Sequence, residues 1–191
     1  MIQKQIIPFH CWHRLDLKKS VGGIMDNIER FVKRSEELRE NNRVSDAEEL
    51  IRDALNDYEE SWRIWSELGL ILMRKQDFDE AVTAFLNATD LEPEAFWPWL
   101  YLGRAKREAG DYEAAIEATE NACNVKTGET ELNLANFNLA CYCALLGRKE
   151  EAMNYLKTAL EGNGSLKKEA RENSDLDSLR NEPGFDLLTA S

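Results

Sequence analysis

The sequence predicts an all-α fold in which about four helix-turn-helix repeats stack into a solenoid, because one residue pattern recurs every 34 residues. In residues 62–95 the pattern consists of Trp65, Leu68, Gly69, Ala81, Phe85, Ala88 and Pro93. The equivalent places one spacing later hold Trp99, Leu102, Gly103, Ala115 and Ala122, and one spacing earlier they hold Phe31, Ala47, Ile51 and Ala54. One helix pair cannot bury its apolar face alone, so neighbouring pairs must stack.

A fourth unit follows after a slip of three residues, and it places Leu139, Ala140, Gly147, Ala152, Leu156 and Ala159 at the equivalent positions. The predicted repeats are therefore 28–61, 62–95, 96–129 and 133–166, which together make a repeat domain over 28–166. Paired helices need small residues where their backbones meet. We expect Gly69, Gly103 and Ala140 at these close approaches, while the first repeat has Ser35 there.

Each predicted repeat divides into two helices. The first has helices over 28–41 and 44–57, joined by a turn at Asn41-Asn42. The next two have helices over 62–75 and 78–91, then 96–109 and 112–125, with turns at Asp77 and Gly110-Asp111. We expect the three inserted residues to lengthen the loop before the fourth repeat, whose helices should span 131–146 and 149–161.

Residues 1–27 are predicted to form an N-terminal tail. Residues 1–24 lack both the repeat pattern and helical periodicity, and Gly22-Gly23 separates them from the amphipathic run near Met25. One hypothesis is that translation begins at Met25, because Val-Gly-Gly-Ile-Met could be a ribosome-binding sequence read as codons.

Residues 167–191 are predicted to be a C-terminal cap over the last repeat, whose apolar face needs a cover. Ser174 or Asp175 could cap one short helix and Pro183 could start another. The residues available for burial are Leu176, Leu179, Phe185, Leu187 and Leu188.

The W-x2-L-G pattern with its small, aromatic and proline positions resembles the tetratricopeptide repeat (TPR). The run N-L-A-C-Y-C-A-L-L-G, followed by D-L-D-S-L-R-N-E-P-G-F, is similar to the closing unit of a group of bacterial TPR proteins that end in D-L-x-x-L-R-x-x-P-x-F. The resemblance implies a right-handed superhelix in which the first helix of each repeat lines a concave groove for a partner peptide.

The resemblance also implies which residues line that groove: Leu70, Met73, Trp97, Leu100, Tyr101, Arg104, Arg107, Phe137, Asn138 and Cys141. Aromatic residues and arginine are enriched in binding hot spots, so the expected partner is a protein or peptide with an apolar or aromatic anchor beside acidic residues. The alternative for any one residue is contact with the neighbouring repeat or the cap. Trp97 is the strongest candidate, because the repeat pattern requires Trp99 but not Trp97.

A two-carboxylate clamp for chaperone tails is not expected. The family's clamp uses lysine, asparagine and arginine at fixed groove positions, and this chain has Val32, Glu36, Glu67, Trp97 and Tyr101 there. Starting the comparison one repeat later gives no match either.

The composition limits the partners. The formal charge is -12; residues 1–24 carry +3, from four cations and Asp16, so the remainder carries -15. Nucleic acid and anionic membranes need clustered cations, so neither is an expected partner. The amino terminus lacks the apolar run of a secretory signal, and we expect a cytoplasmic protein.

No catalytic, metal or cofactor site is expected. The four cysteines, Cys11 among them, lack disulfide-framework spacing, and His10-Cys11-x-His13 offers only three ligands in a short segment. Motifs for nucleophilic, phosphate-binding, dinucleotide-binding or zinc-dependent chemistry are missing.

The sequence therefore favours a non-catalytic adaptor or scaffold that binds a partner in its concave groove. Two alternatives stay open. One is a chaperone resembling the small acidic TPR chaperones of type III secretion, which hold an unfolded client. The other is a structural module that associates with itself through its outer faces.

Overall fold

The computed structural model describes residues 16–190, with side chains from residue 23 onward, and these residues form helices joined by short links. The helices are α1 Asp16–Glu40, α2 Val44–Asp57, α3 Trp62–Lys75, α4 Phe78–Leu91, α5 Phe96–Glu108, α6 Tyr112–Asn124, α7 Glu129–Leu145, α8 Lys149–Gly162, α9 Leu166–Glu172, the 3-10 helix η1 Ser174–Leu179 and α10 Phe185–Thr189. Within this stretch there is no strand, and no helix is long and apolar enough to cross a membrane.

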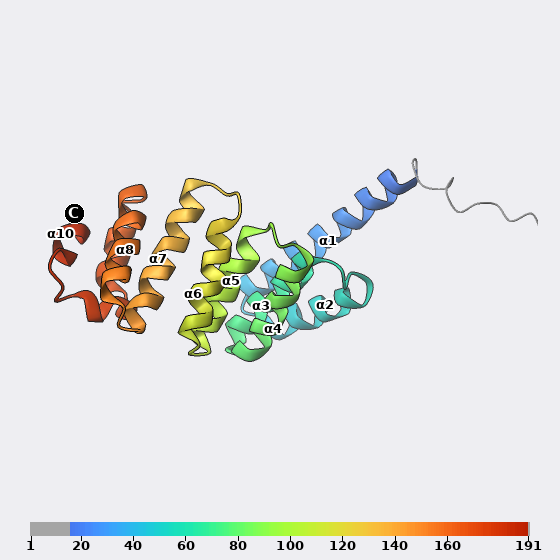
Figure 1. Ribbon diagram of the computed structural model, residues 1–191. Helices are drawn as coiled ribbons and strands as arrows, with labels where there is room; N and C mark the ends of the chain where they lie inside the picture. The colour runs from blue at the N-terminus through green and yellow to red at the C-terminus, as the bar shows by residue number, and fades with distance from the viewer. Residues whose placement is uncertain (1–15, 191) are drawn as a thin grey trace, which may run out of the picture.

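The helices pair along the chain as α1–α2, α3–α4, α5–α6 and α7–α8, and the pairs follow one another from one end of the molecule to the other (Figure 1). The predicted all-α repeat fold is confirmed. Seven of the eight predicted repeat helices begin and end within two residues of their predicted bounds.

The turns inside the four repeats share one backbone conformation. A residue with positive φ ends the turn, and the next amide donates to the carbonyl five residues earlier, as in Schellman C-caps. The amide of Arg43 lies 2.8 Å from the oxygen of Leu38, and that of Arg148 lies 2.8 Å from that of Cys143. The positive-φ residues are Asn42, Gln76, Gly110 and Gly147. Their spacing reproduces the 34-residue repeat and the later slip.

The repeat tryptophans fix the links between helix pairs. The indole of Trp65 donates to the carbonyl of Glu59 at 2.7 Å, and Trp99 donates to the carbonyl of Pro93 at 2.9 Å. Each bond ties the link before a repeat to that repeat's first helix.

Gly69 and Gly103 lie where paired helices come closest. A Cβ on Gly69 would lie 2.6 Å from the ring of Phe85, and one on Gly103 would lie 3.0 Å from the carbonyl oxygen of Ala115 and would also strike Thr119. The predicted close approaches at Gly69 and Gly103 are therefore confirmed.

The first helix differs from its prediction. α1 begins at Asp16 rather than near residue 28 and continues through Gly22-Gly23. The prediction that residues 16–24 are not helical was therefore wrong. Two glycines cost about 1 kcal/mol each in a helix, which lowers its stability without breaking its hydrogen-bond ladder. Residues 1–15 lie outside the described stretch.

The three-residue insertion lengthens a helix, not the predicted loop. The links 58–61, 92–95 and 125–128 are equal in length, whereas α7 has 17 residues against 14 in α3 and 13 in α5. Near the start of this longer helix, Asn133 packs directly on Gly162 of α8, where a Cβ would clash with it.

The C-terminal segment covers the last repeat. Leu176, Leu179 and Phe185 are buried as predicted, with η1 packed on α7 and α10 on α8. Leu187 is 82% exposed, so its predicted burial was wrong; on a helix as short as α10, it turns away while Phe185 faces the core.

The caps of these short helices also differ from those predicted. The side chain of Asn173, rather than Ser174 or Asp175, accepts the capping hydrogen bond, from the amide of Asp175 at 2.9 Å. α10 follows Gly184, whose positive φ makes the turn, so Pro183 does not begin it.

Substituting Gly103→Ala should lower the free energy of unfolding by about 1–3 kcal/mol, the usual cost of overpacking a tight contact. The added methyl would collide with Thr119 and the Ala115 carbonyl, whose hydrogen bond is buried. Urea unfolding followed by circular dichroism measures the loss.

Gly164→Ala is the matched control, because a Cβ there meets nothing within 4 Å. Equal stability of the two variants would contradict a close approach at Gly103.

Candidate functional site

A stripe of side chains along α5 organises the candidate site. Trp97, Tyr101, Arg104 and Glu108 are spaced by four, three and four residues, which places them on one face of the helix. Two hollows open along this stripe. Trp97 and Tyr101 line the first, which we call the N-terminal hollow, while Arg104 and Glu108 line the second, the C-terminal hollow. Together the stripe and the two hollows form the groove.

The N-terminal hollow has a volume of about 600 Å³ and is bounded by the first helices of three successive repeats. Its lining comes from α1, α3 and α5: Glu29, Val32, Lys33, Glu36, Trp62, Arg63, Ser66, Glu67, Leu70, Trp97 and Tyr101. The groove is therefore a surface that only stacked repeats can build.

Aromatic rings hold Trp97 in place on the hollow's wall. Its indole stacks on Tyr101 with ring centroids 5.6 Å apart and meets Phe96 edge-on at 5.3 Å. Tyr101 in turn contacts Phe85 of the core at 5.7 Å. Trp97 keeps 42% of its surface exposed, so it presents a positioned aromatic surface to an incoming group.

A buried ion pair forms part of the hollow's floor. Glu67 of α3 accepts a hydrogen bond from the Ser35 hydroxyl at 2.7 Å and two from the Arg39 guanidinium, at 2.8 and 3.1 Å. Burial raises the pKa of Glu67 above its ordinary value, against the opposing effect of Ser35 and Arg39. The network joins α1 to α3 and places the first repeat.

The remaining polar groups of this hollow differ in their pairing. Arg63 lies over the ring of Trp62, 5.4 Å from its centroid, and pairs with Glu29 at 3.2 Å. The hydroxyl of Ser66 is buried and makes no hydrogen bond within the described part of the chain.

The C-terminal hollow is smaller, about 330 Å³, and the chain's own C-terminal segment forms one wall. α5 and α7 contribute Arg104, Arg107, Glu108, Leu134, Phe137, Asn138, Cys141 and Tyr142, and the C-terminal segment contributes Glu169, Asn173 and Asp175. The Asn138 side-chain nitrogen is buried there without a hydrogen-bond acceptor among residues 23–190.

Two predicted partner contacts instead hold this C-terminal segment. Arg107 binds Asp175 through both carboxylate oxygens, with Nε 3.0 Å from Oδ2. The Asn173 amide lies 3.7 Å from the sulfur of Cys141. Burial, together with the charge of Asp175, raises the pKa of the Cys141 thiol well above its ordinary value, so this thiol stays protonated at neutral pH.

The ten predicted groove residues thus fall into three groups. Leu70, Trp97 and Tyr101 line the N-terminal hollow, and Arg104, Arg107, Phe137, Asn138 and Cys141 line the C-terminal hollow. Leu100 is 1% exposed, so its placement as a groove-lining residue was wrong. Met73 is half-buried, packs against the core and lines neither hollow. Phe137 and Cys141 are also buried and contribute only to the wall.

Sequence reasoning missed the contributions of Trp62 and of the C-terminal residues Asn173 and Asp175. Trp62 is the first residue of the predicted repeat 62–95 and lies eight residues before Leu70, the first groove residue predicted in that repeat. Asp175 is 68 residues from Arg107, and no repeat spacing relates the two.

The described residues contain no group of three His, Cys, Asp or Glu side chains able to hold a metal ion. The candidate ligands His10, Cys11 and His13 lie outside the described stretch.

Comparison with known families finds one kind of repeat. Two family models, both described as tetratricopeptide repeat, match the chain, one over residues 32–96 and 72–123 and the other over residues 135–162. Together they fall on all four helix pairs.

Two known proteins share a stretch with this chain at 32% identity. The first, a chloroplastic protein of Arabidopsis thaliana, aligns over 79 residues, which is 41% of this chain and 24% of that protein. The second, the peroxisomal targeting signal receptor of Saccharomyces cerevisiae (strain ATCC 204508 / S288c), aligns over 93 residues, which is 49% of this chain and 15% of that protein. The matched stretches thus span a quarter or less of these relatives.

Solved structures of MamA have a similar fold. A crystal structure of MamA superimposes with a TM-score of 0.65 and 23% identity over 79% of this chain and 86% of that one. A structure of MamA MSR-1 superimposes with a TM-score of 0.62 and 21% identity over 72% of this chain and 78% of that one. At these identities the likeness concerns the fold.

Replacing Arg39 with Met should destabilise the protein by about 3–5 kcal/mol, because the buried Glu67 carboxylate would lose its cation. Arg34→Met is the control on the same helix. Arg34 pairs with Glu37 on the surface, where an ion pair contributes less than about 1 kcal/mol. Urea unfolding of both variants measures the difference.

The loss in Arg39→Met should shrink as the pH falls from neutrality toward 4.5, the ordinary pKa of Glu67. Because the folded-state pKa of Glu67 is raised, the folded protein binds this proton more tightly than the unfolded chain does. Protonation of Glu67 therefore contributes fully to stability below pH 4.5, and this contribution is lost as the pH rises through the folded-state pKa. A loss that does not change with pH would contradict a buried, unpaired carboxylate in the variant.

Substituting Asp175→Ala should speed alkylation of Cys141 in the native protein severalfold. The change removes the anchor on Arg107 and a negative charge that raises the thiol's pKa. Mass spectrometry of brief iodoacetamide labelling measures the rate. In the control Asp177→Ala, which removes a surface pair with Arg180, the rate should stay unchanged; equal rates in the two variants would contradict this anchoring.

Proposed function

Because this chain belongs to the tetratricopeptide-repeat family, we propose that it is a non-catalytic adaptor or scaffold that binds a segment of another protein in the groove. The observation that carries the proposal is the α5 stripe. It combines an exposed tryptophan, fixed by two neighbouring rings, with an arginine two helical turns away on the same face.

The stripe suggests how such a segment would bind. An apolar or aromatic side chain would enter the N-terminal hollow and pack on Trp97 and Tyr101, between Trp62 and Leu70. Burial of one aromatic side chain contributes about 1.5–3 kcal/mol, enough to make it an anchor.

An acidic residue of the partner would bind at Arg104. This guanidinium is exposed and makes no ion pair with the side chains described here, whereas neighbouring Arg107 is already neutralised by Asp175. The unpaired amide nitrogen of Asn138 lines the same hollow and could donate to the same carboxylate. The expected partner therefore carries an apolar or aromatic anchor followed by an acidic residue.

One relative supports a binding role. The peroxisomal targeting signal receptor is, by its name, a receptor for a targeting signal, and it shares a 93-residue stretch with this chain. The partner proposed for the present protein is inferred from its own groove residues and not from this relative.

The double substitution Trp97→Ala and Arg104→Ala should abolish capture of the partner from native lysate, because it removes both the aromatic surface and the free cation. Quantitative mass spectrometry of pull-downs compares the variant with the wild-type chain. Titration of the recovered partner should then show a loss of affinity of at least about tenfold, equivalent to about 1.4 kcal/mol.

The matched control is Leu86→Ala with Arg34→Ala, which also removes one exposed apolar side chain and one arginine, but at positions that line neither hollow. Circular dichroism and melting should be unchanged in both double variants. The same partners bound by all three proteins would contradict groove binding. A wild-type dimer detected by light scattering and lost in the Trp97→Ala and Arg104→Ala variant would favour self-association.

A further inference from the structure

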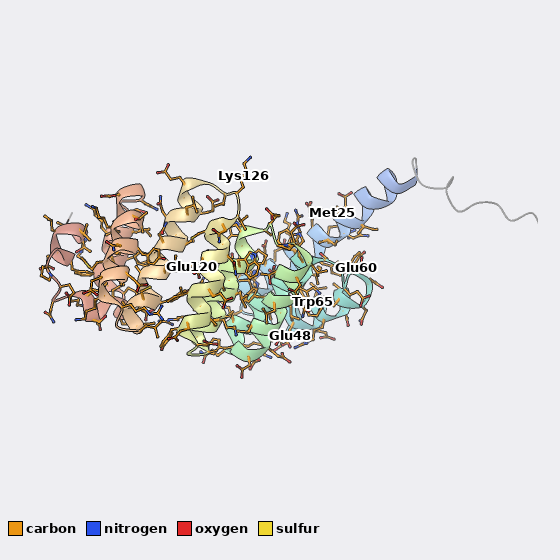
Figure 2. All side chains as sticks on the ribbon, viewed as in Figure 1. Met25, Glu48, Glu60, Trp65, Glu120 and Lys126 are labelled. Carbon is orange, nitrogen blue, oxygen red and sulfur yellow. The ribbon has the colours of Figure 1, made fainter. Side chains whose placement is uncertain are left out.

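A third hollow, which we call the end hollow, lies at the N-terminal end of the solenoid. It has a volume of about 560 Å³ and lies where α1 passes the link between α2 and α3. Its lining consists of Ile24, Met25, Ile28, Asp57, Tyr58, Glu59, Glu60, Ser61, Trp62 and Arg63. Figure 2 shows Met25 on α1 and Glu60 on the link at the same end of the molecule.

The floor of the end hollow is apolar and uncovered. Ile24 is 46% exposed and Met25 is 40% exposed, and Ile28 follows one turn later on the same helix. Large aliphatic side chains exposed side by side indicate a surface that another apolar segment covers.

The rim of the end hollow is acidic. Asp57, Glu59 and Glu60 are exposed, and none of them forms an ion pair with a side chain of residues 23–190. The one cation of the lining, Arg63, is already paired with Glu29. A segment that fits this hollow must therefore combine apolar residues with cations.

Residues 1–15 of this chain have that composition. They contain Lys4 and Arg14 and no acidic residue, so they carry +2, whereas the other residues carry -14. Their apolar residues include Ile6, Ile7, Phe9 and Trp12. A strongly acidic protein thus has one short basic and apolar segment, and it is joined directly to α1.

Residues 1–15 are also long enough to reach the end hollow. Ile24 lies eight residues into α1, which is about 12 Å along the helix at 1.5 Å per residue. About four extended residues cover that distance, so Phe9 and the two isoleucines before it can lie over Ile24 and Met25.

The geometry points to an interaction within the chain: residues 1–15 fold back along α1 and dock in the end hollow. Their apolar side chains cover Ile24, Met25 and Trp62, and their cations face Asp57, Glu59 and Glu60. The docked segment lies over the N-terminal end of the solenoid and borders the groove at Trp62, which lines both the end hollow and the N-terminal hollow.

Photo-crosslinking in the full chain tests this docking. Phe9 is replaced by p-benzoylphenylalanine, and an equal mixture of isotope-labelled and unlabelled chains is irradiated and analysed by mass spectrometry. The expected crosslinks join residue 9 to residues 23–28 or 57–63 within one chain. Crosslinks between labelled and unlabelled chains, crosslinks confined to other surfaces, or none at all would overturn the proposal.

Charge reversal provides the second measurement. Glu59→Lys with Glu60→Lys should lower the crosslink yield severalfold, because the acidic rim no longer attracts the segment. Glu150→Lys with Glu151→Lys is the control, since these acidic residues are also exposed and adjacent but lie on α8. Equal yields in the two variants would show that the rim does not hold the segment and would overturn the assigned contacts.

Discussion

The close approach of the two helices in each repeat is the constraint on which the rest of the structure depends. At Gly69 and Gly103 the partner helix occupies the space that a Cβ would need. This contact fixes how α5 is rotated against α6, and therefore which of its residues face the other way. Trp97, Tyr101 and Arg104 line the groove because the opposite side of α5 is committed to its partner helix. A shift of this contact would move the whole stripe.

Two long-range ion pairs stabilise the two ends of this regular stack of repeats. In the first repeat Ser35 stands where the next two repeats have glycine, and with Arg39 it binds Glu67 of the next repeat. After the last repeat, Asp175 of the C-terminal segment binds Arg107, and this segment packs on α7. Both pairs join residues that are not equivalent in the repeat. The ends of the solenoid are thus held by specific polar contacts, and its middle is held by repeated apolar ones.

The periodic features could be predicted from the sequence, and the features that break the period could not. The bounds of α2 to α8, the turns and the close approaches all follow from the 34-residue spacing, because each depends on local residues. The Glu67–Arg39 and Arg107–Asp175 pairs depend on stacking geometry, and neither follows the repeat spacing. The insertion was misplaced because three extra residues fit either a longer loop or nearly one more helical turn, and the repeat spacing does not distinguish the two. In the groove, the family resemblance predicted Trp97, Tyr101 and Arg104. It did not predict that Leu100 is buried or that Asp175 pairs with Arg107.

The C-terminal wall of the groove has a consequence for the length of anything bound in it. At the roughly 8–10 Å spacing typical of packed helices, α1, α3, α5 and α7 would span about 27 Å, or about eight residues of extended chain. Beyond α7, η1 and Asp175 occupy the position in which another repeat would continue the surface. A longer partner must therefore bend away or end at this wall. The proposed groove would therefore limit the length of its ligand as well as its chemistry.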